Sequence, residues 1–189
     1  MLSTAATTEI SVGLTRRPLA ELSDRRSPMR DEADMQISGI LRPEAVKVLV
    51  STTSKKRLFH DVADMVAACH DIAIPTAVEA LLERENLGPT AVGKGVALPH
   101  ARLPGIEGVI GAFVRLEKPL DFDAVDKQPI DLAFFLFAPE AAGVEHLKAL
   151  ALVARTLRDE TLCEKLRSNR SPAALYGILT AEISATAAA

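Results

Sequence analysis

The pattern of apolar and polar positions divides most of this chain into helices and strands. After Ser54, a good N-cap residue, apolar side chains recur at intervals of three and four residues. This spacing predicts an amphipathic helix over Lys55–His70. Directly after Pro75, Thr76 and Glu79 have the spacing of a capping box, which predicts the start of a second helix that ends before Gly-Pro.

Three more helices are predicted near the C-terminal end. The first spans Gly143–Arg158, and the second is the short segment Glu160–Arg167. The third begins at Ser171–Pro172, where an N-cap residue precedes a proline at the first helical position. Its predicted apolar face comprises Leu175, Ile178, Leu179 and Ile183. The inward stripe predicted for the first of these helices comprises Leu147, Leu150, Ala151, Ala154 and Leu157.

Short apolar runs between the helices are typical of buried strands. Val96–Leu98 is one of them, and Pro99 is expected to end it because proline lacks an amide donor. The aspartate-rich segment Pro119–Pro129 is predicted to be a loop with at most one short strand. The other predicted strands are Val46–Val50, Val109–Leu116 and Ile130–Phe137.

Helices that flank a small set of buried strands predict an α/β fold. The order of elements is not a strict alternation of strand and helix, so we expect a mixed β-sheet with α-helices on both faces. Residues 1–36 lack a sustained apolar period and are expected to form a disordered or loosely attached arm. The folded domain is expected to span residues 37–184, and residues 185–189 are expected to fray.

Composition argues against several classes of function. The chain has 189 residues, a hydrophobic content of 48% and a net charge of −3, which argues against non-specific nucleic-acid binding. The longest apolar run, Ile130–Ala138, is too short to span a membrane and contains Asp131. Cys69 and Cys163 are expected to be free thiols, since no metal-ligand spacing is present. We therefore expect a cytoplasmic protein without a metal or cofactor.

Two of the four histidines stand in positions that favour chemistry. His100 follows a glycine loop, a buried strand and Pro99, so its ring is expected to face a cleft. His146 is in the first turn of a predicted helix, where main-chain amides favour an anion. A neutral imidazole is a good nucleophile at pH 7, which suits phosphoryl transfer. A capped strand end and a polar residue at a helix start are the corresponding structural interpretations.

Two features near His100 bear on phosphate binding. Gly88–Gly95 nearly matches a nucleotide phosphate loop, but Gly95 replaces the Ser or Thr that would hold Mg²⁺. A helix precedes this loop and a strand follows it, which is the reverse of the required order. Arg84 is a candidate phosphate ligand, although its position between Glu83 and Glu85 is also typical of a solvated charge.

The stretch LLERENLGPTAVGKGVALPHA resembles the active-site region of the enzyme IIA proteins of the bacterial phosphoenolpyruvate-dependent phosphotransferase system, fructose/mannitol class. Within that class it is most similar to the nitrogen-type regulatory branch. The resemblance runs from about Ile37 to about Ile183. It includes LEKPLDFDAVDKQPIDLAFFLFAP and HLKALALVARTLRDETLCEKLR.

The resemblance implies roles for particular residues and the fold of that class. The phosphorylated histidine of the family falls on His100, its second active-site histidine on His146, and its phosphate-pocket arginine on Arg84. The implied donor is a phosphohistidine carrier of the HPr type. Lys94 stands where asparagine is usual and could help to hold phosphate; Ala101–Arg102 replaces the usual Gly-Lys.

Three functions are compatible with these residues. The first is a regulatory phosphocarrier, rather than an enzyme for a small molecule, whose phosphorylation state selects targets such as potassium transporters or sensor kinases. The second is a sugar-transport enzyme IIA that passes phosphate to an enzyme IIB. The third is a binding module whose histidine is not phosphorylated.

Overall fold

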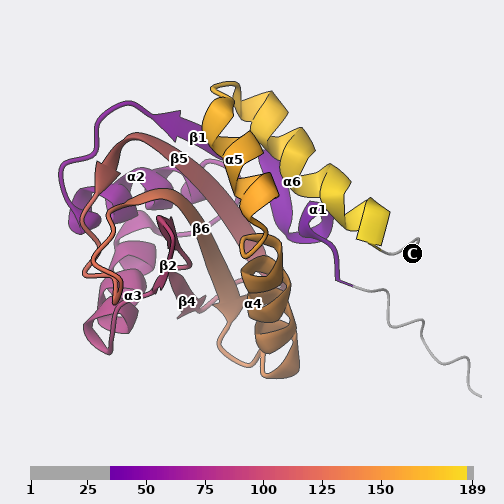
Figure 1. Ribbon diagram of the computed structural model, residues 1–189. Helices are drawn as coiled ribbons and strands as arrows, with labels where there is room; N and C mark the ends of the chain where they lie inside the picture. Colours follow the sequence, from indigo (N-terminus) through magenta and orange to yellow (C-terminus); the bar gives the residue numbers. More distant parts are fainter. Residues whose placement is uncertain (1–34, 187–189) are drawn as a thin grey trace, which may run out of the picture. The chain divides into compact units, whose positions relative to one another are not determined.

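A six-stranded mixed sheet organises the part of the chain that the computed structural model describes, residues 35–186, with side chains described to residue 181. The strand order is β1-β5-β6-β3-β2, and β4 also pairs with β6 (Figure 1). The strands are β1 (Leu41–Leu49), β2 (Ala91–Gly93), β3 (Val96–Ala97), β4 (His100–Leu103), β5 (Ile110–Leu120) and β6 (Ile130–Pro139).

Helices cover both faces of this sheet, which confirms the predicted mixed α/β fold. In Figure 1, α2 and α3 lie on one side of the strands and α4, α5 and α6 on the other. Helix α3 packs on β4, α4 packs on β6, and α6 packs on β1. The helices are α1 (Ile37–Ile40), α2 (Lys55–Ala67), α3 (Ile74–Asn86), α4 (Val144–Thr156), α5 (Glu160–Ser168) and α6 (Pro172–Thr186).

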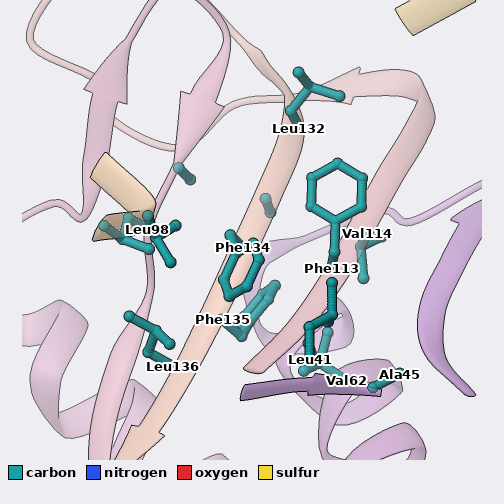
Figure 2. Packing of buried hydrophobic residues seen from close by; sticks show 14 of the residues in the cluster. Leu41, Ala45, Val62, Leu98, Phe113, Val114, Leu132, Phe134, Phe135 and Leu136 are labelled. Carbon is teal, nitrogen blue, oxygen red and sulfur yellow. The ribbon is translucent and has the colours of Figure 1, made fainter. Parts of the chain in front are cut away.

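Strand β6 is the centre of the core. All but two of its ten residues are buried, as expected for a strand covered on both faces. Phe134 lies opposite Phe113 of β5, and the next residue, Phe135, packs edge-on against Phe59 of α2. Figure 2 shows Phe113, Phe134 and Phe135 packed along β5 and β6. Because successive side chains alternate between faces, this single strand joins both hydrophobic layers.

The strand before Pro99 ends there, as predicted, but pairing with β6 resumes directly after the proline. β3 pairs parallel to β6 with Val96 opposite Leu132, and β4 continues in the same register with His100 opposite Leu136. The carbonyl of Pro99 accepts from the amide of Leu136 at 3.0 Å, so only the donor side of the ladder is interrupted. His100 is therefore the first residue of a strand, not a residue beyond one.

Other boundaries also differ from those predicted. Helix α1 was not expected, and β1 begins at Leu41, well before the predicted Val46. A shift in register between these two residues accommodates Pro43 within β1, which hides the strand from pattern analysis. Strand β5 continues to Leu120, into the segment predicted as a loop.

Of two predicted helix N-termini, the structure confirms one and contradicts the other. The predicted N-cap Ser54 is confirmed, since its side chain accepts from the amide of Arg57 at 3.2 Å. The predicted capping box of Thr76 and Glu79 is wrong. Helix α3 begins at Ile74, with Pro75 in its first turn, so both residues already lie inside the helix. Proline tolerates that first turn because it has no amide to satisfy there.

The predicted inward stripe of α4 is wrong at Leu147 and Ala151, which are exposed, whereas Leu157 is buried and Leu150 and Ala154 pack against the core. Leu147 is 66% exposed, and the buried residues of this helix are His146, Ala149, Leu152 and Val153. The helix has apolar residues on most sides, so periodicity could not fix which face packs against β6. The consequence is that His146 faces the interior of the fold.

Some expectations fall outside the described residues. These are the arm at its residues 1–34, the last three residues of the tail, and the side chain of Ile183. Cys69 and Cys163 are free. Within residues 35–186, no helix is long and apolar enough to serve as a membrane span.

The turn between β2 and β3 has an unusual backbone. Gly93, Lys94 and Gly95 have φ angles of 92°, 54° and 76°, in the left-handed region. The carboxylate of Asp126 accepts from the amide of Lys94 at 2.8 Å, and Arg167 donates to the carbonyl of Lys94 at 2.7 Å. These two contacts hold the turn in place.

Gly95→Ala is expected to lower the free energy of unfolding by about 2 kcal/mol. An added Cβ would lie 2.8 Å from Nη2 of Arg167 and 2.9 Å from Oδ1 of Asp131, at a φ that disfavours alanine. Urea unfolding measures the change. The control is Gly108→Ala, where an added Cβ has nothing within 4 Å. Equal stability of the two variants would contradict the role assigned to the turn.

Candidate active site

Three of the four residues predicted from the sequence line one cavity. Arg84 comes from α3, His100 from the start of β4 and His146 from the first turn of α4. The cavity has a volume of about 520 Å³, and Leu87 and Arg102 also line it. The ring centroids of His100 and His146 are 5.7 Å apart with an edge-on arrangement. Three elements that are distant in sequence thus converge on one point.

The hydrogen bonds of His100 define its tautomer. Nδ1 lies 2.9 Å from the carbonyl oxygen of Leu98, which can only accept, so Nδ1 carries the proton. Nε2 lies 2.9 Å from Nε of Arg84, which can only donate. In a neutral ring the lone pair is therefore on Nε2, directed at the Arg84 guanidinium. Both neighbours select the same tautomer.

The surroundings also keep both imidazoles neutral at pH 7. Burial lowers the pKa of His100; the hydrogen bond to Leu98 opposes this shift and the charge of Arg84 adds to it. Burial lowers the pKa of His146, and His100 and Arg102 lower it further. Since each pKa moves below its ordinary value of 6.5, His100 keeps a free lone pair at and below neutral pH.

His146 has an unsatisfied polar atom. The residue is only 7% exposed, and its Nε2 is buried without a hydrogen-bond partner among the described residues. An orphaned polar atom in a buried position costs free energy unless a ligand satisfies it. His146 also lines the cavity beside His100.

Arg84 is held by a second contact. Its Nη1 donates to the carbonyl of Gly88 at 3.1 Å, while its Nε donates to His100. The two bonds fix the plane of the guanidinium, so the side chain is not the solvated charge that its acidic neighbours suggested. A planar guanidinium in this position can also donate to an oxyanion.

A buried carboxylate supports the backbone that carries His100. The Glu85 side chain is only 8% exposed and accepts from the amide and hydroxyl of Thr90 at 3.2 and 2.6 Å. The carbonyl of Thr90 accepts from the amide of Leu98, whose own carbonyl binds His100. Lys55 pairs with Glu85 at 3.0 Å and satisfies the buried charge. This network holds the Leu98 carbonyl in position to accept the hydrogen bond from Nδ1 of His100.

The structure does not bring Lys94, the fourth predicted residue, into this cavity. Its ammonium pairs with Glu160 of α5, and its backbone is bound by Asp126 and Arg167. The left-handed turn directs Lys94 toward α5, so the geometry does not support the predicted phosphate contact.

Sequence reasoning missed Arg102, which lines the cavity two residues after His100. Its guanidinium donates to the carbonyl of Glu140 at 3.2 Å and its side chain is exposed. The signal was present in the sequence, because alternate residues of a strand share a face and His100 and Arg102 both belong to β4.

Together these groups suit a phosphoryl group rather than a metal. A neutral nucleophilic nitrogen, a fixed guanidinium and a second imidazole line one cavity, so it offers a nucleophile for phosphorus and two candidate donors for phosphoryl oxygens. Within residues 35–186, no group of three or more His, Cys, Asp or Glu side chains is arranged to hold a metal ion.

Comparison with known proteins agrees with this geometry. Residues 39–182 match the family described as phosphoenolpyruvate-dependent sugar phosphotransferase system, EIIA 2. A nitrogen regulatory protein of Bradyrhizobium diazoefficiens is 46% identical over 145 residues, which cover 77% of this chain and 95% of that protein. The nitrogen regulatory protein of Escherichia coli K12 is 38% identical over 151 residues, 79% of this chain and 93% of that protein.

A solved structure gives the same result. The crystal structure of nitrogen regulatory protein IIA-Ntr from Neisseria meningitidis aligns with a TM-score of 0.70 and 36% identity, covering 76% of this chain and 99% of that one. The family match and these relatives extend over nearly the whole described fold. This chain therefore belongs to the EIIA 2 family of the phosphoenolpyruvate-dependent sugar phosphotransferase system.

Proposed function

We propose that this protein is a nitrogen-type phosphocarrier that accepts a phosphoryl group on Nε2 of His100. The observation that supports this best is the pair of hydrogen bonds that leaves the lone pair of His100 on Nε2, beside Arg84. The family membership and the relatives named nitrogen regulatory protein support the same function.

The proposed transfer is a direct displacement at phosphorus. As the phosphoryl group approaches, Arg84 moves its hydrogen bond from Nε2 to a phosphoryl oxygen. The bond from phosphorus to the donor's histidine nitrogen breaks and the bond to Nε2 of His100 forms. The carbonyl of Leu98 stabilises the positive charge that the ring acquires, because Nδ1 still carries its proton. His146 donates to a second phosphoryl oxygen through its unpartnered Nε2.

The proposed donor is an HPr-like phosphohistidine protein of the nitrogen branch, in the cytoplasm. The half-buried His100 lies at an open cavity, so another protein's histidine can reach it. Phosphorylation adds about two negative charges at this point, which is sufficient to change the affinity of a protein interface. We propose that the two states bind different targets, such as potassium transporters or sensor kinases.

A domain assignment completes this proposal. The phosphocarrier domain spans residues 37–184, in accord with the family match over 39–182.

A sugar-transport enzyme IIA that passes phosphate to an enzyme IIB is the second candidate, since the family is defined by sugar phosphotransferase systems. The two candidates share the chemistry at His100 and differ in the acceptor. Transfer from the phosphorylated protein to a purified fructose- or mannitol-class enzyme IIB would favour transport, and its absence would favour regulation.

The central test is labelling from radioactive phosphoenolpyruvate in the presence of enzyme I and the HPr-like carrier. The wild-type protein is expected to take up label that is stable to base and labile to acid, as a phosphoramidate is. His100→Ala is expected to take up none, while His60→Ala, outside the cavity, labels normally. Label on His100→Ala would overturn the assignment, and an unlabelled wild type would favour a pure binding module.

Arg84→Lys is expected to slow phosphate uptake about tenfold, because lysine cannot bind Gly88 and a phosphoryl oxygen together in the fork geometry of arginine. Rapid-quench labelling measures the rate. Arg158→Lys, an exposed residue after α4, serves as the matched control. A normal rate in the Arg84 variant would mean that the guanidinium only supports the loop.

His146→Ala is expected to retain phosphate uptake at a rate reduced about a hundredfold, because one oxyanion donor is lost. His146→Gln keeps a side-chain donor and should recover part of the rate. The same labelling assay applies, with urea unfolding to verify that each variant is folded. If both variants transfer at the wild-type rate, His146 serves packing alone.

A further inference from the structure

A second cavity lies apart from the phosphoryl site. Its volume is about 610 Å³, and it shares no lining residue with the cavity at His100. Sites for small molecules have volumes of about 300–1,000 Å³. Buried Ile40, Leu41 and Ile110 contribute an apolar surface, and Ile106 and Val109 are half-buried. The proposed transfer makes no use of this space.

A fixed cation stands at this cavity. Nη1 of Arg42 donates to the carbonyl of Cys69 at 2.7 Å, which anchors the guanidinium on the turn that follows α2. No carboxylate of the described residues forms an ion pair with Arg42. Its other donors therefore remain available to a carboxylate from solution, the partner that matches a guanidinium best.

Two carboxylates line the same cavity without cationic partners. Asp71 follows the end of α2, and Glu107 belongs to the loop that leads from β4 to β5. Neither forms an ion pair or side-chain hydrogen bond within the described part of the chain. Neither carboxylate forms an ion pair with Arg42. One positive group and two negative groups therefore line the same cavity separately.

His70 adds an unsatisfied polar atom. Its Nε2 is buried and has no hydrogen-bond partner among the described residues, and the residue lines this cavity. Burial and the charge of Arg42 lower the pKa of His70, so its ring is neutral at pH 7. The charges around the cavity are then those of Arg42, Asp71 and Glu107.

We infer that this cavity binds a free α-amino acid with an apolar side chain. The ligand carboxylate pairs with Arg42 and Nε2 of His70, its ammonium pairs with Asp71 or Glu107, and its side chain covers the apolar surface at Ile110. A simple anion fits less well, because two carboxylates would repel it. A simple cation fits less well, because it would approach Arg42 and leave Nε2 of His70 unsatisfied.

The test is isothermal titration calorimetry of the full chain with L-leucine, L-isoleucine, L-valine, L-methionine and L-phenylalanine. Saturable binding of at least one of them is expected. For an amino acid that binds, the matched carboxylic acid lacking the amino group and the matched amine lacking the carboxylate should each bind about tenfold more weakly or worse. For L-leucine these are 4-methylpentanoate and isopentylamine.

Variants locate the site. Arg42→Gln and, separately, the double change Asp71→Asn with Glu107→Gln are expected to weaken binding about tenfold or more. These side chains are exposed, so the variants should fold. Arg158→Gln is the control for loss of an exposed arginine elsewhere, and Arg84→Gln is the control for binding at the phosphoryl site.

Three results would overturn the inference. The first is the absence of saturable binding with all of the amino acids. The second is equal affinity for the amino acid and its deaminated acid, which would indicate a simple anion site. The third is unchanged affinity in Arg42→Gln, or loss of binding in Arg84→Gln alone. The test needs no phosphoryl donor, so its outcome is independent of the function proposed for His100.

Discussion

The hydrogen bond from Nδ1 of His100 to the carbonyl of Leu98 is the interaction on which the active site depends. It fixes the tautomer, holds the plane of the ring and leaves the lone pair of Nε2 at the cavity. The bond is short-range in sequence, but the position of its acceptor is a property of the sheet. Leu98 lies between two segments that pair with β6 in one register, and its amide is held by Thr90.

The electrostatic arrangement follows from burial. Arg84 and Arg102 bring positive charge to the cavity, while both imidazoles are kept neutral because desolvation lowers their pKa values. The nearby carboxylate of Glu85 binds Thr90 and Lys55, and through Thr90 it supports the backbone that carries His100. A doubly charged phosphoryl group therefore meets two guanidinium groups at this cavity, whose lining also includes the carboxylate of Glu83.

The errors of pattern analysis occur where the local sequence allows more than one arrangement. Periodicity marks which residues are apolar, but α4 is apolar on more than one side, so only its packing on β6 decides that His146 faces inward and Leu147 outward. The capping residues were misplaced because Pro75 can stand inside the first turn as well as before it. Lys94 is predicted to hold phosphate because it adds a positive charge where asparagine is usual, yet a left-handed turn directs it to Glu160.

The sequence by itself determined the α/β class, most of the helices, the buried central strand and the candidacy of His100, because these depend on local periodicity and on residue chemistry. Only the tertiary structure decided how Arg84 and His146 meet His100, which ring nitrogen carries the proton, and that Arg102 joins the cavity. Those features depend on strand register and helix packing between distant segments. A shift of register by one residue would turn His100 to the other face of the sheet, and no local pattern records that choice.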